Sequence, residues 1–579
     1  MVSPVAAITP ALTAAIESAL GAEFAGSDPV LRPSQYADVQ VNAALALAKR
    51  AKRAPRDVAA AIVEALDLSE QCSAVEVSGP GFINLTFRES WLATLVDDLA
   101  RDARLGVPTQ ERQIIPIDYS APNVAKEMHV GHLRTTVVGD ALARTLEHLG
   151  HQVIRQNHIG DWGTPFGMLI EQLLDVGEDS AQAALLETDP NAFYQSARER
   201  FDGEPDFATR ARARVALLQS GDAETLRHWQ RLIGLSTTYF NRIYAALGVT
   251  LTDADLAGES TYNDELAGIC DELEAKGIAE ISDGALCVFL PGYTGREGKP
   301  VPLIIRKSDG GYGYGTTDLA TIRRRVRDLH ANRVLYVVGA PQALHFRMVW
   351  ETARLAGWLT DDVEVIHVQI GNVLGEDRKI LRTRSGAPLR LMALIEEAVG
   401  QARAHIDDAR PDLPEADRAR IAAQIGVGGI KYADLSVAHD SEYVFDLDRM
   451  LALTGNTGPY LQYASTRIRS IFRSIGVDPA SPAVADAPIA LTEPSERALG
   501  LLLLEFGTVV AAVGDELEPH RLCAYLFEVA QAFSAFYENC PVLKAEGPVR
   551  DSRLALCALT LRVMVTGLDL IGIEAPEQM

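Results

Sequence analysis

Two histidines three residues apart, His129 and His132, flank a glycine in the sequence His-Val-Gly-His, and Lys126 precedes them. Residues three apart on a helix lie on one face, and a helix N-terminus favours anions. Two imidazole donors there could hold a phosphate whose charge grows during a reaction, and Gly131 would let a flat ring approach the backbone. Phosphoryl or nucleotidyl transfer depends mostly on such positioning. The alternative is an ordinary helix start with two surface histidines.

The elements expected around these residues favour nucleotide chemistry. The apolar run Ile114–Ile117 predicts a buried strand, and Pro122 helps to end it. Apolar periodicity then predicts a helix that stops near Gly150. Such a strand–turn–helix unit opens doubly wound α/β folds and places ligands at the carboxyl end of the strand.

The segment Pro122–His132, PNVAKEMHVGH, resembles the HIGH signature of class I aminoacyl-tRNA synthetases. Its Pro-Asn-x-Ala-Lys start resembles that of arginyl-tRNA synthetases in particular, and the similarity runs from about residue 30 to Met579. The resemblance implies an arginine–tRNA ligase whose substrates are L-arginine, ATP with Mg²⁺, and tRNA(Arg). The arginine carboxylate would attack the α-phosphorus of ATP, and the terminal ribose of the tRNA would then attack the mixed anhydride. Members generally need tRNA for the first step.

The same resemblance implies which residues of the first signature meet ATP. The catalytic residues would be Lys126, His129 and His132, which stabilise the phosphate charge. The ATP contacts in this segment would be Pro122, Asn123, Lys126, His129, Gly131 and His132.

The second class I signature, a Lys-Met-Ser-Lys-Ser loop, is degenerate in this chain. It corresponds to Gly375–Gly386, with Ile380–Arg384 over the motif. In arginyl enzymes the upstream lysine, matching Lys126, takes part of the missing charge's role. Lys379, Arg382 and Arg384 could still reach the ATP phosphates; the alternative is a basic surface loop.

An arginine pocket is the next prediction. A guanidinium is planar and always charged, so a selective site needs a carboxylate, neutral acceptors and an aromatic wall. Tyr314 and Asp318 are four apart at a helix start and share a face, and Gln342 follows the next strand. The resemblance implies that Asn123, Tyr314, Asp318 and Gln342 hold the arginine substrate, and the predicted site also includes Asp118 and Ser120. The alternative for Asp318 is a carboxylate that serves the helix dipole.

Length and pattern predict a multidomain α/β protein. Residues 1–110 predict an N-terminal α+β domain, which in the family contacts the tRNA elbow. Residues 111–405 predict a Rossmann-type catalytic domain with a parallel sheet, interrupted at about 169–300 by a mostly helical insertion. The pattern of residues 406–579 predicts helices, and this region resembles the α-helical anticodon-binding domain of the family.

Exposed tyrosines suit unstacked bases, so Tyr460, Tyr463 and Tyr537 are candidate tRNA contacts; core aromatics are the alternative. The chain departs from the family at Ser465, Thr466 and Ser534, where members often carry histidine.

Charge and composition limit the remaining possibilities. The formal net charge of −24 excludes a generic nucleic-acid coat, although a large enzyme can bind RNA through local basic patches. Six scattered cysteines indicate neither a zinc site nor a disulfide framework, and we expect a cytoplasmic monomer with no structural metal. No apolar run approaches a membrane span, and the N-terminus is typical of an amphipathic helix rather than of a signal peptide.

Two other functions remain open at this stage. Another class I synthetase, or a nucleotidyltransferase that shares the His-x-Gly-His turn, would not bury a carboxylate at Asp318 beside Gln342. A non-catalytic RNA-binding relative should have lost the signature histidines, and both are present.

Overall fold

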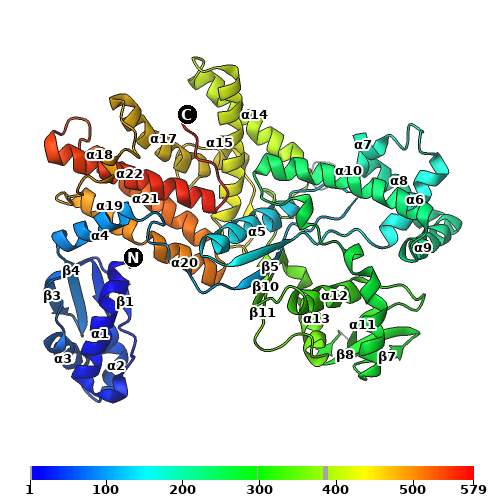
Figure 1. Cartoon of the computed structure of the whole chain (residues 1–579), viewed down its shortest axis with the longest axis horizontal. Coiled ribbons are helices and arrows are strands. Elements are labelled where there is room, and N and C mark those ends of the chain that lie inside the picture. The colour runs from blue at the N-terminus through cyan, green and yellow to red at the C-terminus, as the bar shows by residue number, and fades with distance from the viewer. Residues whose placement is uncertain (1–2, 125, 296–297, 383–388) are drawn as a thin grey trace.

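The arrangement of the domains is visible in the computed structural model, which describes residues 3–124, 126–295, 298–382 and 389–579. A small N-terminal domain lies below a C-terminal helical bundle in the view of Figure 1. A parallel sheet lies at the centre of the molecule, and a helical insertion extends from it on the side opposite the N-terminal domain. The predicted fold class is confirmed.

The central sheet has four parallel strands in the order β11-β10-β5-β6. Its strands are β5 (Ile114–Asp118), β6 (Gln152–Gln156), β10 (Arg333–Gly339) and β11 (Glu364–Ile370). The chain builds outward from β5 to β6, then returns to add β10 and β11 on the other side of β5. The strand order therefore reverses between β5 and β10, and the crevice at their carboxyl ends is where such sheets bind ligands.

Helix α5 (Gly131–His148) follows β5 and packs on the sheet and on the helical domain. Twelve of its residues are buried, among them the charged side chains Arg134 and Asp140. Its apolar residues recur at helical spacing, which is why the first signature helix could be predicted.

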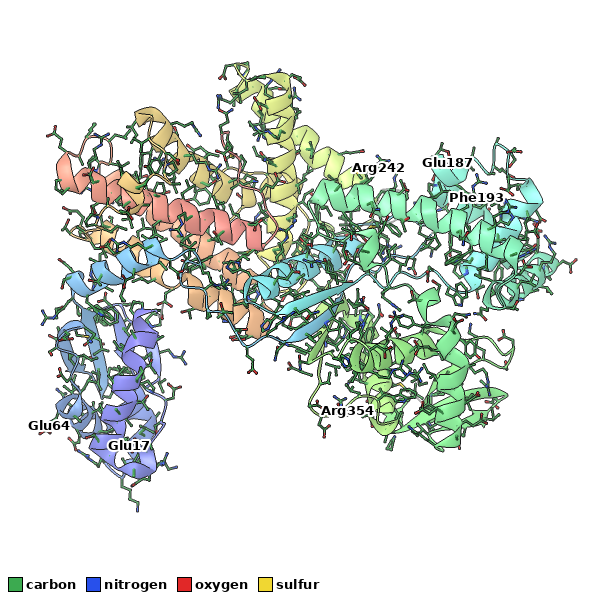
Figure 2. All side chains as sticks on the ribbon, in the orientation of Figure 1. Glu17, Glu64, Glu187, Phe193, Arg242 and Arg354 are labelled. Atoms are coloured by element: carbon green, nitrogen blue, oxygen red, sulfur yellow. The ribbon has the colours of Figure 1, made fainter. Side chains whose placement is uncertain are left out.

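The insertion contains the helices α6 (Thr164–Val176), α7 (Leu185–Thr188), α8 (Pro190–Gly203), α9 (Pro205–Gln219), α10 (Ala223–Leu247) and α11 (Asn263–Ala275). Phe193 of α8 is buried inside this lobe (Figure 2). Asp222 caps α10 by accepting the Thr225 N–H, and Gly248 ends it in a left-handed conformation.

The insertion predicted at about 169–300 is mostly helical, but its C-terminal end forms strands. Strands β7 (Ala279–Ser282), β8 (Ala285–Thr294) and β9 (Pro300–Arg306) form a separate antiparallel sheet. Strand β9 therefore belongs to this sheet and not to the parallel one. Its residues alternate between buried Leu303 and Ile305 and the exposed Ile304, so one face is open, as antiparallel sheets allow.

The N-terminal domain is a four-stranded antiparallel sheet in the order β1-β2-β4-β3, covered by three helices. Its elements are α1 (Pro4–Leu20), β1 (Leu31–Pro33), β2 (Val39–Val41), α2 (Ala43–Ala51), α3 (Pro55–Ala65), β3 (Cys72–Ser78) and β4 (Phe82–Phe87). Glu17 and Glu64 lie on its side facing away from the rest of the chain (Figure 2). Helix α4 (Glu89–Arg101) leads into the helical bundle and packs on α19.

The C-terminal domain is a helical bundle. Its longer helices are α14 (Leu391–Ala409), α15 (Glu415–Leu435), α17 (Gly458–Ile475), α19 (Pro494–Leu504), α20 (Phe506–Glu516), α21 (His520–Asn539) and α22 (Gly547–Leu570). The stretch Pro494–Glu516 is long and apolar enough to cross a membrane by length and composition alone, and half of it is buried. Residues such as Leu499, Leu503 and Val510 belong to the bundle core, so packing accounts for its apolar character.

Candidate active site

The turn after β5 is held in an unusual backbone conformation. Ser120 and Ala121 have φ values of 68° and 45°, a region that non-glycine residues rarely adopt. The Ala121 N–H donates to Oδ1 of Asn157 at 3.1 Å, and the Ser120 hydroxyl lies 2.8 Å from Tyr244 Oη and 2.9 Å from Thr136 Oγ1. This buried network fixes the turn at the strand end, where strained backbone concentrates at functional sites.

The two signature histidines lie together, but only His132 is on the helix. Helix α5 begins at Gly131, and His129 precedes it, so the expectation that both share a helical face is wrong in detail. Their rings are nevertheless 4.1 Å apart between centroids. Gly131 leaves room for the His129 ring, because a Cβ there would lie 2.8 Å from Cε1 of His129.

Hydrogen bonds assign the proton positions of these rings. The backbone N–H of Gly131 donates to Nδ1 of His129, and that of His129 donates to Nδ1 of His132, both at 3.1 Å. In a neutral imidazole the other nitrogen then carries the proton. Burial lowers the pKa of His129 and lowers that of His132 to about 4. Near pH 7 the turn therefore offers two neutral Nε2–H donors.

These histidines line a cavity of about 380 Å³ that we call the histidine cleft. Its walls come from the first signature, from the end of β10, and from the segment after β11. The residues that line it include Ser120, Asn123, His129, Gly131, His132, Arg134, Gln342, Ile370, Val373, Ile380 and Arg382. Residues predicted for different roles therefore line one cleft: the signature histidines and Arg382, predicted to contact ATP, and Asn123 and Gln342, predicted to contact arginine.

The remaining ATP-contact candidates are placed differently. Buried Pro122 accepts the Gly160 N–H at 3.3 Å and so ties the signature to the Gly160–Gly163 loop. Lys379 is exposed in a tight turn, where its carbonyl accepts the Gly375 N–H at 2.8 Å. Arg384 lies outside the described residues.

Lys126 lies outside the histidine cleft, in a small cavity beside the insertion. Its Nζ is 4.3 Å from the ring centroid of Tyr194 on α8. The neighbouring Glu127 is held by Asn191, which accepts its backbone N–H at 3.2 Å and donates to its carboxylate at 2.6 Å. The insertion therefore holds Lys126 and Glu127, which lie just before the signature histidines, through these contacts.

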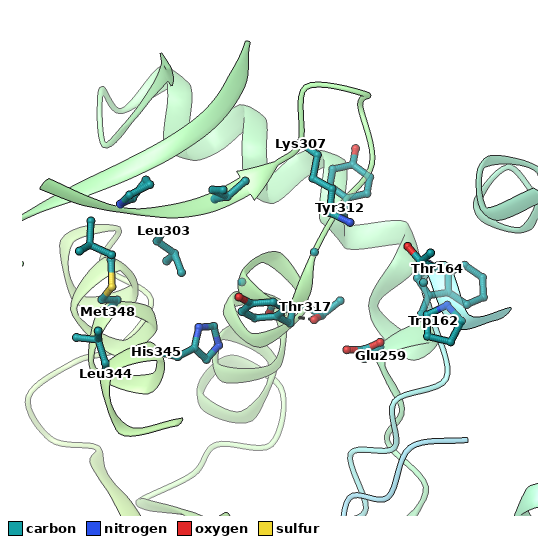
Figure 3. Close-up of a pocket in the computed structure, with 18 of the residues that line it drawn as sticks. Trp162, Thr164, Glu259, Leu303, Lys307, Tyr312, Thr317, Leu344, His345 and Met348 are labelled. Atoms are coloured by element: carbon teal, nitrogen blue, oxygen red, sulfur yellow. Dashed lines mark hydrogen bonds between the residues drawn. The ribbon is translucent and has the colours of Figure 1, made fainter. Parts of the chain in front are cut away.

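A second cavity, of about 610 Å³, adjoins the first, and Pro341 lines both. We call it the Tyr314 pocket. Its lining includes Trp162, Thr164, Glu259, Tyr312, Tyr314, Thr317 and His345. Figure 3 shows Leu344, His345 and Met348 on one side of the pocket and Trp162, Thr164 and Glu259 on the other.

Asp318 lies beside this pocket between two histidines. Its carboxylate is 2.6 Å from Nε2 of His345 and 3.8 Å from Nε2 of His158. The Tyr314 ring, 69% exposed, makes an edge contact with the His345 ring at 4.9 Å. Tyr314 and Asp318 thus share one side of α12 (Tyr314–Arg327), as their spacing predicts.

The side chains of Asp118 and Ser120 are hydrogen-bonded to other side chains of the protein. The carboxylate of Asp118 accepts a hydrogen bond of 2.8 Å from Arg325, whose side chain is fully buried. The Ser120 hydroxyl belongs to the turn network. Gln342 ends the short helix that follows β10 and lies in the histidine cleft rather than in the Tyr314 pocket.

Sequence reasoning missed three ionisable residues of this site. Burial raises the pKa of Glu259 to about 7, and the nearby carboxylates of Asp318 and Asp161 act in the same direction. His158 lies two residues after β6, so its position near a strand end could have indicated it. His345 lies in the first turn of the helix Ala343–Leu355, which follows Gln342. Glu259 lies in a short 3₁₀ helix of the insertion, and no pattern pointed to it.

The tyrosines proposed for tRNA differ in exposure. Tyr463 is 44% exposed. Tyr460 packs edge-on against Phe527, with centroids 5.6 Å apart. Tyr537 lies under Arg467, whose guanidinium carbon is 4.4 Å from the ring centroid. Of the three, Tyr463 presents the most open ring.

Three family models match the chain. "Arginyl tRNA synthetase N terminal domain" matches residues 6–87, "tRNA synthetases class I (R), catalytic domain" residues 94–447, and "DALR anticodon binding domain" residues 461–579. Together they cover the three regions described above.

Individual proteins agree with these matches. The chain is 69% identical to an arginine–tRNA ligase of Thermobifida fusca, with all of both chains covered, and 53% identical to one of Frankia casuarinae over 98% of this chain and 97% of the other. The arginyl-tRNA synthetase structures of Plasmodium falciparum and Thermus thermophilus align with TM-scores of 0.82 and 0.78 at 26% and 25% identity. They cover 100% and 99% of this chain and 100% of each of theirs. The chain therefore belongs to the class I arginyl-tRNA synthetases.

Proposed function

We propose that ATP occupies the histidine cleft and arginine the adjoining Tyr314 pocket in the reaction of this arginine–tRNA ligase. The arginine carboxylate attacks the α-phosphorus of ATP, pyrophosphate leaves, and the terminal ribose of the tRNA takes the arginyl group. Because Pro341 lines both cavities, the two substrates would meet at the carboxyl ends of β5 and β10. This shared wall is the observation on which the proposal rests.

His129 and His132 would stabilise the phosphate charge as neutral donors. Each presents an Nε2–H, because each Nδ1 already accepts a backbone N–H. Preorganised donors need no rearrangement as charge develops, which is how such groups lower a barrier. Gly131 and Asn123 complete this wall of the cleft.

Positive charge for the phosphates would come from Lys126, Lys379, Arg382 and Arg384. Arg382 already lines the cleft. Lys126 would have to leave the Tyr194 ring to reach the phosphates, and a lysine has the flexible stem for that movement. Mg²⁺ would enter with ATP.

Asp318 would pair with the guanidinium of arginine, against the ring of Tyr314. In the ligand-free pocket His345 and His158 contact its carboxylate, so a guanidinium would replace or join an existing partner. Glu259, across the pocket, supplies a second carboxylate. Gln342 and Asn123 lie toward the histidine cleft and would hold the amino-acid end of the substrate. Asp118 and Ser120 would support this wall from the strand end.

The helical domain would bind the anticodon, with Tyr463, Tyr460 and Tyr537 as base platforms. We further propose that the chain acts as a monomer in the cytoplasm, where its six buried thiols would stay reduced.

Arginine-dependent exchange of pyrophosphate into ATP tests this function. We expect exchange with arginine at saturating tRNA, and much less when tRNA is omitted. Exchange with another amino acid and none with arginine would contradict the proposal.

A further inference from the structure

A buried arginine connects the first signature helix to the helical domain. Arg134 lies two residues after His132, and its side chain is 1% exposed. Its Nε donates to Oδ1 of Asp434 at 3.0 Å, and Asp434 is completely buried at the end of α15. Tyr443 donates its hydroxyl to the other carboxylate oxygen at 3.2 Å, and the guanidinium carbon lies 5.2 Å from its ring centroid.

The same guanidinium also holds the chain that follows α15. Its two terminal nitrogens donate to the carbonyls of Ser441 and Ala438. One side chain therefore binds a carboxylate and two backbone carbonyls, which takes the planar, five-donor fork that only arginine has. None of these contacts belongs to the substrate-binding roles proposed above.

The segment held by Arg134 is in turn paired with the chain after β11. Strand β13 (Tyr443–Val444) pairs in parallel with β12 (Val373–Leu374). The Gly371 N–H donates to the His439 carbonyl and the Phe445 N–H to the Leu374 carbonyl, both at 2.8 Å. Gly371 allows the close approach, because a Cβ there would lie 2.5 Å from the Ser441 carbonyl oxygen.

The chain around β12 and the signature turn both line the histidine cleft. Residues 370–373 and 380–382 contribute to its lining, and so do His129, His132 and Arg134. Arg134 is thus bonded to the segment that pairs with the chain around β12.

We propose that Arg134 is a positioning residue that sets the distance between the signature turn and the chain around β12 in the ATP cleft through Asp434, Ala438 and Ser441. The inference rests on the proposed assignment of ATP to this cleft. Because arginine is assigned to the neighbouring pocket, loss of the Arg134 contacts affects ATP much more than arginine.

Arg134→Lys tests the proposal, since it keeps the charge beside Asp434 but loses the fork. In pyrophosphate exchange at saturating tRNA we expect the KM for ATP to rise about tenfold, the loss of two hydrogen bonds, while the KM for arginine changes less than about twofold. Tyr443→Phe removes only the hydroxyl bonded to Asp434, and we expect a smaller rise in the same KM. It also serves as the test if Arg134→Lys fails to fold.

Arg144→Lys is the matched control. Arg144 lies on the same helix, pairs with Asp140 and Asp569, and donates to the Gly248 carbonyl, but it does not line the histidine cleft. We expect this variant to lower the melting temperature without changing either KM.

A KM for ATP that stays at the wild-type value in Arg134→Lys and Tyr443→Phe, or a rise shared equally with arginine, would overturn the proposal. Binding of ATP alone to the full chain, measured by equilibrium dialysis, separates it from the proposed function. Weaker ATP binding in Arg134→Lys supports the positioning role even if arginine-dependent exchange is absent from the wild type. In that case only the proposed function fails.

Discussion

At the residue scale, the site combines neutral donors for phosphate with ionisable groups for a cation. The imidazoles of the signature are held neutral by burial. A buried charge costs free energy before any ligand arrives, whereas a neutral N–H donor costs much less and still stabilises developing negative charge.

Loss of one signature imidazole should therefore slow the chemical step selectively. We expect His132→Ala to lower kcat for exchange by about 10²–10³, the typical effect of removing one such donor. The KM for arginine should stay near the wild-type value, because His132 lines the histidine cleft and not the Tyr314 pocket. Steady-state exchange with each substrate varied in turn measures both, and an unchanged kcat would remove His132 from the phosphate role.

Glu259 should make arginine binding depend on pH. Its pKa in the folded protein is raised to about 7, so the carboxyl is protonated below that pH and ionised above it. A guanidinium prefers the ionised form, and the KM for arginine should fall as pH rises from 6 to 8.

Glu259→Gln provides the control for this pH effect. With no titrating group at the position, the KM for arginine should be higher and nearly flat over the same range. A wild-type KM that rises with pH would contradict the role of Glu259.

At the element scale, helix α8 of the insertion contacts the first signature. Asn191 and Tyr194 of α8 hold Glu127 and Lys126. An ammonium over an aromatic ring is stabilised by about 0.5–2 kcal/mol, so movement of Lys126 to the phosphates, as proposed above, would cost about that free energy.

Tyr194→Ala should release this lysine. We expect the KM for ATP to fall about two- to fivefold, which corresponds to about 0.5–1 kcal/mol of lost cation–π attraction, while Tyr194→Phe behaves like the wild type. In a Lys126→Met background the Tyr194→Ala change should have no effect on this KM. A persistent effect there would show that Tyr194 acts on something other than Lys126.

The burial of each helix or strand explains which of them could be predicted from the sequence. Strands β5 and β10 are almost entirely buried, and the apolar run of β5 identifies it in the sequence. Helix α5 is identified by the apolar periodicity of its residues. The antiparallel strands β7–β9 were missed in part because their alternation, with Ile304 exposed and Leu303 buried, lies in a charge-rich region. Glu259 could not be found, because only tertiary packing brings this insertion residue beside Asp318.

At the scale of the whole molecule, side-chain contacts tie the domains together. Arg497 of α19 pairs with Asp38 of the N-terminal domain and also donates to the Phe87 carbonyl at 3.2 Å. Asp97 accepts the Ile489 N–H at 2.7 Å, and Arg562 donates to the Asp102 carbonyl at 2.7 Å. These contacts fix the N-terminal domain and α4 on the bundle.

Arg497→Ala should loosen this junction. We expect a loss of about 1–3 kcal/mol in the free energy of unfolding, because Asp38 is left without its charged partner. Arg198→Ala is the matched control: Arg198 pairs with Asp202, both more than half exposed, and such pairs contribute less than about 1 kcal/mol. Denaturant unfolding of both variants measures the difference, and equal losses would contradict the structural role of the Arg497 pair.

Discrimination between arginine and citrulline tests most directly the claim that an acidic pocket for a permanent cation adjoins the phosphate-binding turn. Citrulline has nearly the shape of arginine, but its side chain is a neutral urea. We expect kcat/KM in tRNA-dependent exchange to favour arginine by about 10³-fold or more, and Asp318→Asn to reduce that ratio at least about tenfold while the KM for ATP stays unchanged. An unaltered ratio in Asp318→Asn would contradict this account of the site.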